Sequence, residues 1–157
     1  MSLFEPSEIY QFAIKIEENG EKFYRRMSQK FKESKVKEIF SYLADEETKH
    51  KKIYQEMVSK IEKYEPLESY PGEYFTYLRA YADNVIFSKE KLEEKISKIG
   101  DLVSAIEFGM NIERDSILYY QDIKNLVPEN RRIPIDKIIE EERRHFLKLL
   151  EIKKTTK

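Results

Sequence analysis

Histidine is rare in this chain, and each of its 2 histidines follows a glutamate by three residues. The pairs are Glu47 with His50 and Glu142 with His145. Positions three apart share one face of an α-helix, so each pair can direct a carboxylate and an imidazole at a common point. That combination suits a metal ion. Glutamate is abundant in this sequence, however, so the spacing alone does not establish a site.

The composition is that of a folded chain and excludes several classes of protein. The 157 residues are 40% hydrophobic and 38% charged, which is enough to bury a core without disulfides. No apolar run reaches the ~20 residues of a bilayer helix, and the first residues lack a signal-peptide pattern. A formal net charge of -1 provides no basic field for nucleic acid or anionic lipid. We therefore expect a single cytoplasmic domain over residues 1–157 that binds neither nucleic acid nor membrane.

Cysteine is absent from the chain. This excludes disulfides, thiolate zinc sites, iron–sulfur clusters and any iron centre of the rubredoxin type. Metal chemistry in this chain must use oxygen and nitrogen ligands.

Helical periodicity dominates the sequence, which predicts an all-α protein. Glycine is scarce, and no short runs of β-branched residues alternate with polar ones. Two helical hairpins are predicted, over residues 7–63 and 101–153. Their start signals are Ser7, Ser34 and Asp101 as helix caps for the first three long helices, and Pro134 as a first-turn residue of the fourth.

The segment over residues 64–100 has a different texture, with Pro66, Pro71 and a cluster of aromatic residues. We predict a long crossover containing two short helices, at about residues 73–87 and 89–98. A crossover of this length can carry the chain from one end of a four-helix bundle to the other, which makes the two helices beside it parallel.

Both Glu–His pairs lie on the apolar stripes of their helices. The stripes advance in alternating steps of three and four residues, which is the pattern of a helix packed in a bundle. They read Val36, Phe40, Leu43, Glu47, His50, Tyr54 and Met57 in the second helix, and Ile135, Ile138, Glu142, His145, Leu149 and Ile152 in the fourth. A solvated run of charges would lie on the opposite face, so this placement carries more weight than the motif.

The two halves of the chain also repeat each other. Glu17 in the first helix and Glu113 in the third occupy matching positions, and each half carries one Glu-x-x-His motif. Burying four unpaired carboxylates would cost several kcal/mol for each, whereas two divalent cations would neutralise them. Oxygen-rich ligation with one imidazole per ion suits iron or manganese better than structural zinc. The predicted metal ligands are Glu17, Glu47, His50, Glu113, Glu142 and His145.

With these six positions in place, the sequence resembles the ferritin-like di-iron carboxylate proteins, and most nearly the rubrerythrin group that lacks a rubredoxin domain. The resemblance covers all four long helices and implies a ferritin-like four-helix bundle holding two iron ions, with manganese possible. It further implies that Glu47 and Glu142 bridge or chelate the metals. Tyr24 and Tyr120 match family tyrosines that are expected to hydrogen-bond to the ligand carboxylates.

Several neighbouring residues bear on this site. Rubrerythrins carry a further glutamate where this chain has Ser116, so the ligand switching they show is not expected here. Gly20 and Ser116 either relieve crowding or leave a channel for a small oxidant. Glu18, Glu46 and Glu141 adjoin predicted ligands but step off the apolar stripe, so we do not expect them to replace those ligands.

The leading functional hypothesis is a redox protein in which two Fe(II) ions reduce hydrogen peroxide or dioxygen. An external donor must then supply electrons. The resemblance favours peroxidase-like chemistry and implies a homodimer. The alternatives are ferritin-type iron oxidation or storage, a monooxygenase acting on an organic substrate, and a structural or binding bundle. The missing fifth helix and the bulky crossover argue against a ferritin cage, and the buried carboxylates argue against a purely structural role.

Overall fold

The computed structural model describes residues 6–61 and 72–156. Within these ranges all regular structure is helical, as predicted. The helices are α1 (Pro6–Lys30), α2 (Ser34–Ser59), α3 (Gly72–Val85), α4 (Lys89–Ser97), α5 (Leu102–Lys124) and α6 (Glu129–Thr155). No helix in the described part is both long enough and apolar enough to cross a membrane.

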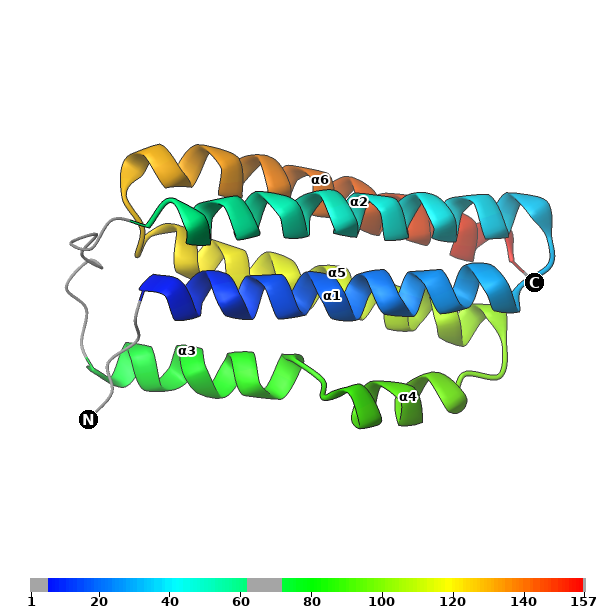
Figure 1. Cartoon of the computed structure of the whole chain (residues 1–157). Helices are drawn as coiled ribbons and strands as arrows, with labels where there is room; N and C mark the ends of the chain where they lie inside the picture. Colours follow the sequence, from blue (N-terminus) through cyan, green and yellow to red (C-terminus); the bar gives the residue numbers. More distant parts are fainter. Residues whose placement is uncertain (1–5, 62–71, 157) are drawn as a thin grey trace.

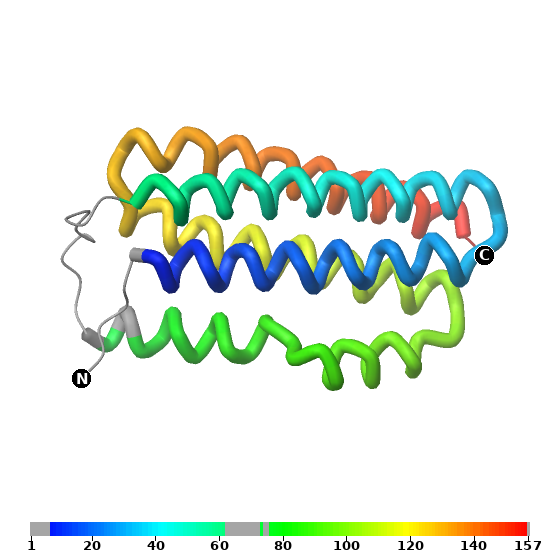
Figure 2. The backbone as a smooth tube through the Cα atoms, in the orientation of Figure 1, coloured from blue at the N-terminus to red at the C-terminus, as the bar shows by residue number. Residues whose placement is uncertain are grey.

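Four long helices form a bundle, and two short ones run along its side (Figure 1). Helix α1 packs on α2 and α5 packs on α6, while the two hairpins meet along α1 with α5 and along α2 with α6. The chain then travels the length of the bundle through α3 and α4, so that α2 and α5 run in the same direction (Figure 2). The four-helix bundle with a helical crossover is therefore confirmed, although Pro66 and Pro71 lie outside the described residues.

The apolar core falls into two clusters at opposite ends of the bundle. One cluster lies under α3 and includes Tyr10, Tyr54, Leu78, Tyr119, Ile123 and Ile138. The other lies under α4 and includes Phe23, Met27, Phe40, Leu92, Ile106 and Leu149. The crossover thus adds a helix to each cluster, and the middle of the bundle is left to the polar residues described below.

The predicted helix starts are right for one helix and need correction for three. Asp101 is the N-cap of α5, and its carboxylate accepts a hydrogen bond from the Ser104 amide at 2.7 Å. Ser7 lies within α1, which includes Pro6, and the N-cap of α2 is Glu33 rather than Ser34. The side chain of Glu33 accepts no capping hydrogen bond. Helix α2 ends at Ser59, a few residues before residue 63, the predicted end of the first hairpin.

The fourth long helix begins at Glu129, not at Pro134. Proline at this position removes only the bond to the carbonyl of Asn130, which is an exposed residue that water can reach. The guanidinium of Arg131 donates to the Lys60 carbonyl at 2.8 Å, and that of Arg132 donates to the Val127 carbonyl at 3.1 Å. The first contact holds the added turn against the end of α2, and the second ties it to the loop before α6.

Candidate metal centre

The middle of the bundle contains a layer of buried carboxylates and imidazoles between the two apolar clusters. Each of the four long helices contributes to it, and every member is at most 1% exposed. The members are the six predicted ligands: Glu17 from α1, Glu47 and His50 from α2, Glu113 from α5, and Glu142 and His145 from α6. All six side chains therefore point into the bundle, as their positions on the apolar stripes predict.

These residues form two overlapping groups in which the potential ligand atoms lie within 4.8 Å of one another. One group is Glu17, Glu47, His50 and Glu142, and the other is Glu47, Glu113, Glu142 and His145. Glu47 and Glu142 belong to both groups, which is the arrangement expected of carboxylates shared by two ions. The two imidazole rings are nearly parallel, with centroids 5.8 Å apart. The structure thus brings all six together, and their role as ligands stays a prediction.

The layer contains buried polar atoms that no protein group satisfies. Among the described residues, one carboxylate oxygen each of Glu17, Glu47, Glu113 and Glu142 and the Nδ1 atom of His145 lack a hydrogen-bond partner. Nδ1 of His50 and the other oxygen of Glu142 have no partner beyond their 2.6 Å contact with each other and the 3.6 to 4.0 Å contacts of the layer. A buried polar atom without a partner costs free energy, and such atoms are few in native proteins. Here they converge on two points, and all are ligand types that iron and manganese accept. The residues present therefore fit a pair of metal ions.

Protonation compensates for the crowded charge in the metal-free chain. Burial, together with the carboxylates of Glu142 and Glu17, holds the pKa of Glu47 well above its ordinary value. Burial and the carboxylates of Glu113 and Glu17 do the same to the pKa of Glu142. For Glu113, contacts with Glu142 and His145 outweigh burial, so its pKa is lowered. Metal ions at this site would therefore replace protons.

His50 faces two of these carboxylates. Its Nδ1 atom lies 2.6 Å from Oε1 of Glu142 and 3.6 Å from Oε1 of Glu17. Burial alone would lower the pKa of His50, but the two carboxylates outweigh it and raise the pKa to about 12. The two carboxylates thus favour the protonated form of His50 in the metal-free chain.

Two buried tyrosines bond to the layer across the bundle. The Tyr120 hydroxyl donates to Oε1 of Glu17 at 2.6 Å, and the Tyr24 hydroxyl donates to Oε1 of Glu113 at 2.7 Å. Each tyrosine therefore orients the single glutamate of the other hairpin. Gly109 allows the approach of Tyr24, because a Cβ atom there would lie 3.1 Å from the tyrosine ring.

Comparison with known proteins gives the family of this chain. The family model for rubrerythrin matches residues 8–153. The chain belongs to the rubrerythrin family. This confirms the resemblance inferred from the motifs.

A solved structure from Thermotoga maritima supports the same assignment. It is described as a candidate ferritin-like diiron-carboxylate protein and superposes with a TM-score of 0.70 at 27% sequence identity. The alignment covers 98% of this chain and 97% of that chain. The ferritin-like fold is thereby confirmed. No curated protein sequence matches the chain.

Two glutamates of this rubrerythrin-family site, Glu141 and Glu46, contact the predicted histidine ligands, a role that the sequence pattern did not assign to them. Oε2 of Glu141 lies 2.6 Å from Nε2 of His50, and Oε1 of Glu46 lies 3.7 Å from Nε2 of His145. Each glutamate contacts the histidine of the opposite hairpin from the side away from the ligand cluster. A proton on Nε2 would be shared with the carboxylate, which leaves Nδ1 free to bind metal. The doubled glutamate before each histidine, repeated in both halves, was the available signal.

The two small residues near the site have different surroundings. A Cβ atom at Gly20 would lie 3.2 Å from Cδ of Glu47, so the missing side chain relieves crowding around a predicted ligand. Ser116 lines a cavity of about 20 Å³ between α1, α5 and the α3–α4 junction, together with Asn19 and Asp115. The channel for a small oxidant stays a prediction, and the space beside Ser116 has room for about one water molecule.

Proposed function

We propose that this protein is a di-iron oxidoreductase that reduces hydrogen peroxide or dioxygen with electrons from an external donor. The observation that supports it best is the convergence of unsatisfied carboxylate and imidazole atoms on two points that share Glu47 and Glu142. The rubrerythrin family and the diiron-carboxylate description of the structural neighbour agree with this reading.

A bound pair of Fe(II) ions would supply one electron each, so that one hydrogen peroxide and two protons become two waters. The chain holds the ligands in place. Tyr24 and Tyr120 fix the rotamers of the single glutamates, and Glu141 and Glu46 orient the histidines. The apolar clusters on both sides exclude bulk water from the layer.

Anaerobic loading with Fe(II) tests the proposal. We expect about two ions per chain, and faster oxidation by stoichiometric peroxide than by dioxygen. The variant Glu142→Ala removes a residue shared by both groups and should reduce the bound metal to less than one ion. The exposed residue Glu140, on the same helix, provides the control Glu140→Ala. Equal metal content in the two variants would refute the di-metal site.

The same experiment separates the ferritin-type alternative. A protein that stores iron should take up many more than two ions per chain with dioxygen, and its native mass should be that of a large assembly. A protein that turns over peroxide should instead stop at about two ions and require a reductant for each further cycle.

A further inference from the structure

An apolar groove of about 380 Å³ lies on the outer surface of α5 and α6. It is lined by Ile117, Phe146 and Leu147, with Arg114 and Arg143 at its rim. Leu147 is 61% exposed, and Leu118, beside Ile117 in the sequence, is 50% exposed. Large apolar side chains this exposed are few among the described residues, and Leu147 lies in a groove whose floor is apolar.

The groove lies directly behind the candidate metal centre. Arg114 follows Glu113 in the sequence, Arg143 follows Glu142, and Phe146 follows His145. Successive residues of a helix point about 100° apart, so only the walls of α5 and α6 separate the groove from three predicted ligands. Helices α3 and α4 run along the neighbouring side of the bundle, where α3 packs on α5 and α4 on α1 (Figure 1). An electron that arrives at the groove would therefore have a short path to the layer, because three groove residues are each bonded through the backbone to a predicted ligand.

The rim of the groove is positively charged, and the nearest compensating charge is that of Asp115, beside Arg114 in the sequence. Arg114 donates a hydrogen bond to the neutral Asn111, and neither Arg114 nor Arg143 forms an ion pair with a described residue. Elsewhere exposed arginines are paired, as Arg25 is with Asp45 and Arg144 with Glu140. No carboxylate lines the groove.

This charge pattern selects among possible occupants. A second copy of the chain docking by the same groove around a twofold axis would bring four guanidiniums together, which is unfavourable. A partner with carboxylates around an apolar patch would complement both the rim and the floor.

We propose that the groove formed by Arg114, Ile117, Arg143, Phe146 and Leu147 docks the external electron donor, an acidic one-electron carrier protein whose redox group is exposed in an apolar patch. The donor loses one electron and one ferric ion gains it, with no bond made or broken, and two such encounters restore the ferrous pair. This inference rests on the proposed function, because only a site that turns over needs a donor.

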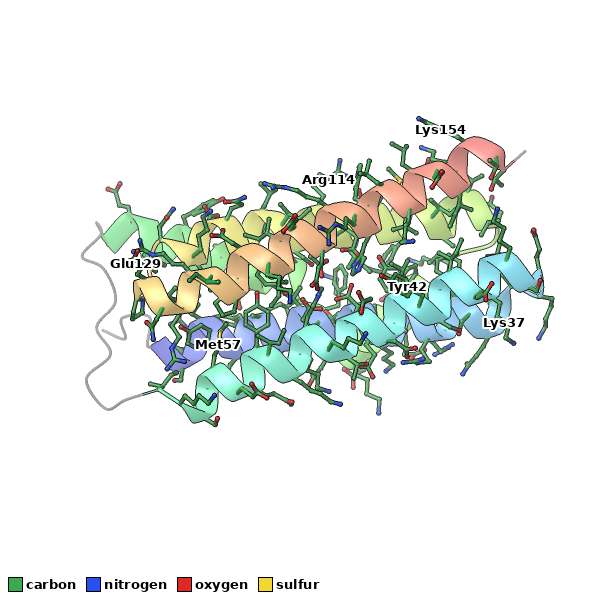
Figure 3. The ribbon with its side chains drawn as sticks, turned by 90° about the horizontal axis from the view of Figure 1, so that it is seen from above. Lys37, Tyr42, Met57, Arg114, Glu129 and Lys154 are labelled. Atoms are coloured by element: carbon green, nitrogen blue, oxygen red, sulfur yellow. The ribbon has the colours of Figure 1, made fainter. Side chains whose placement is uncertain are left out.

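Binding of an acidic flavodoxin to the full chain tests the surface without depending on turnover. Titration calorimetry at low salt, with and without Fe(II), measures Kd for the wild type and for R114E/R143E. The matched control is K37E/K52E, which changes net charge equally on exposed residues of α2. Figure 3 shows Lys37 on the α2 side of the bundle and Arg114 on the α5–α6 side.

We expect R114E/R143E to raise Kd by about tenfold or more and K37E/K52E to change it by less than about threefold. Leu147→Ser should also weaken binding, with little change in salt dependence. Absence of flavodoxin binding by the wild type, or equal losses in the two double variants, overturns the docking surface. So does a dimer in sedimentation that R114E/R143E dissociates.

Stopped-flow reduction of the ferric protein separates this inference from the proposed function. If the docking surface is right, R114E/R143E slows reduction by flavodoxin but leaves oxidation of the Fe(II) protein by peroxide unchanged. If the wild type binds flavodoxin at the groove and yet holds no redox-active iron, the docking surface stands and the proposed function fails.

Discussion

Glu141 and His50 come from opposite helical hairpins, yet Oε2 of the glutamate lies 2.6 Å from Nε2 of the histidine. The contact fixes the imidazole so that Nδ1 points into the layer. We predict that Glu141→Gln, which removes the charge but keeps the shape, lowers affinity for the metal bound by His50 by about tenfold to a hundredfold. Competition with a chelator measures this affinity. The control is Glu140→Gln, one residue earlier and 63% exposed, and matching affinities in both variants would contradict the orienting role.

Tyr120 and Tyr119 are adjacent in sequence and both fully buried, which makes them a matched pair. Tyr120 donates to Glu17, whereas Tyr119 donates to the carbonyl of Ile9 at 3.0 Å. Tyr120→Phe leaves a ligand carboxylate without its donor, so we expect metal affinity to fall by about tenfold, in line with a charged hydrogen bond. Tyr119→Phe should cost about 1 kcal/mol of folding stability and leave metal affinity unchanged. The reverse ranking of affinities would rule out the orienting role of Tyr120.

The absence of a side chain at Gly20 leaves room for the side chain of Glu47. In Gly20→Ala the new methyl group would meet Cδ and Cγ of Glu47 at 3.2 and 3.3 Å, so this shared carboxylate must move. Alanine favours a helix over glycine by about 1 kcal/mol, so the metal-free variant should be at least as stable as the wild type. Metal affinity should nevertheless fall.

The control for this variant is Gly100→Ala, because a Cβ atom there meets nothing within 4 Å. Thermal unfolding with and without metal measures both quantities. Unchanged affinity in Gly20→Ala would show that Glu47 binds metal equally well from another rotamer.

The stability of the metal-free chain should fall as pH rises. The pKa values of Glu47, Glu142 and His50 are all raised in the folded state, so folding favours their protonated forms. Their contribution is complete below the unfolded pKa values and is lost as pH rises toward the folded ones. The pKa of Glu113 is lowered in the folded state, so this group has the opposite effect on stability. That effect changes with pH only below about pH 4.5, which is outside the range from pH 6 to pH 9. We therefore expect Tm in excess chelator to decrease from pH 6 to pH 9.

Metal binding should reverse this trend, because the ions displace the same protons and bind more tightly as pH rises. The increase in Tm produced by saturating Mn(II) should therefore grow over the same interval. A chelated protein whose Tm rises from pH 6 to pH 9 would show that these groups are ionised in the folded metal-free chain.

The inward placement of the six predicted ligands could be derived from sequence because the helical period decides which residues share a face. Val36, Leu43, Glu47, His50 and Met57 are all buried on α2 as the stripe requires. The same rule undervalued Glu46 and Glu141. Their backbones step off the stripe, but a glutamate side chain is long enough to reach a histidine across the interface of α2 and α6.

Where a helix starts depends partly on contacts with residues distant in the sequence, which a local sequence pattern does not reveal. Pro134 fits the first turn of a helix by its chemistry, yet α6 begins at Glu129 because distant groups support the extra turn, such as the carbonyl of Lys60 bonded to Arg131. The groove over α5 and α6 was also out of reach, since it needs side chains from two helices whose relative rotation is fixed only by packing.

The parallel course of α2 and α5 has a consequence for how such a site can originate. Each hairpin holds three of the six inward groups, and both metal groups draw on both hairpins. A single hairpin is therefore an incomplete chelator, whereas two hairpins related by a twofold axis would rebuild both groups. The fold has the form of a symmetric dimer joined into one polypeptide by α3 and α4. Either hairpin alone supplies only three of the four members of its group, so each complete group needs one glutamate from the other hairpin.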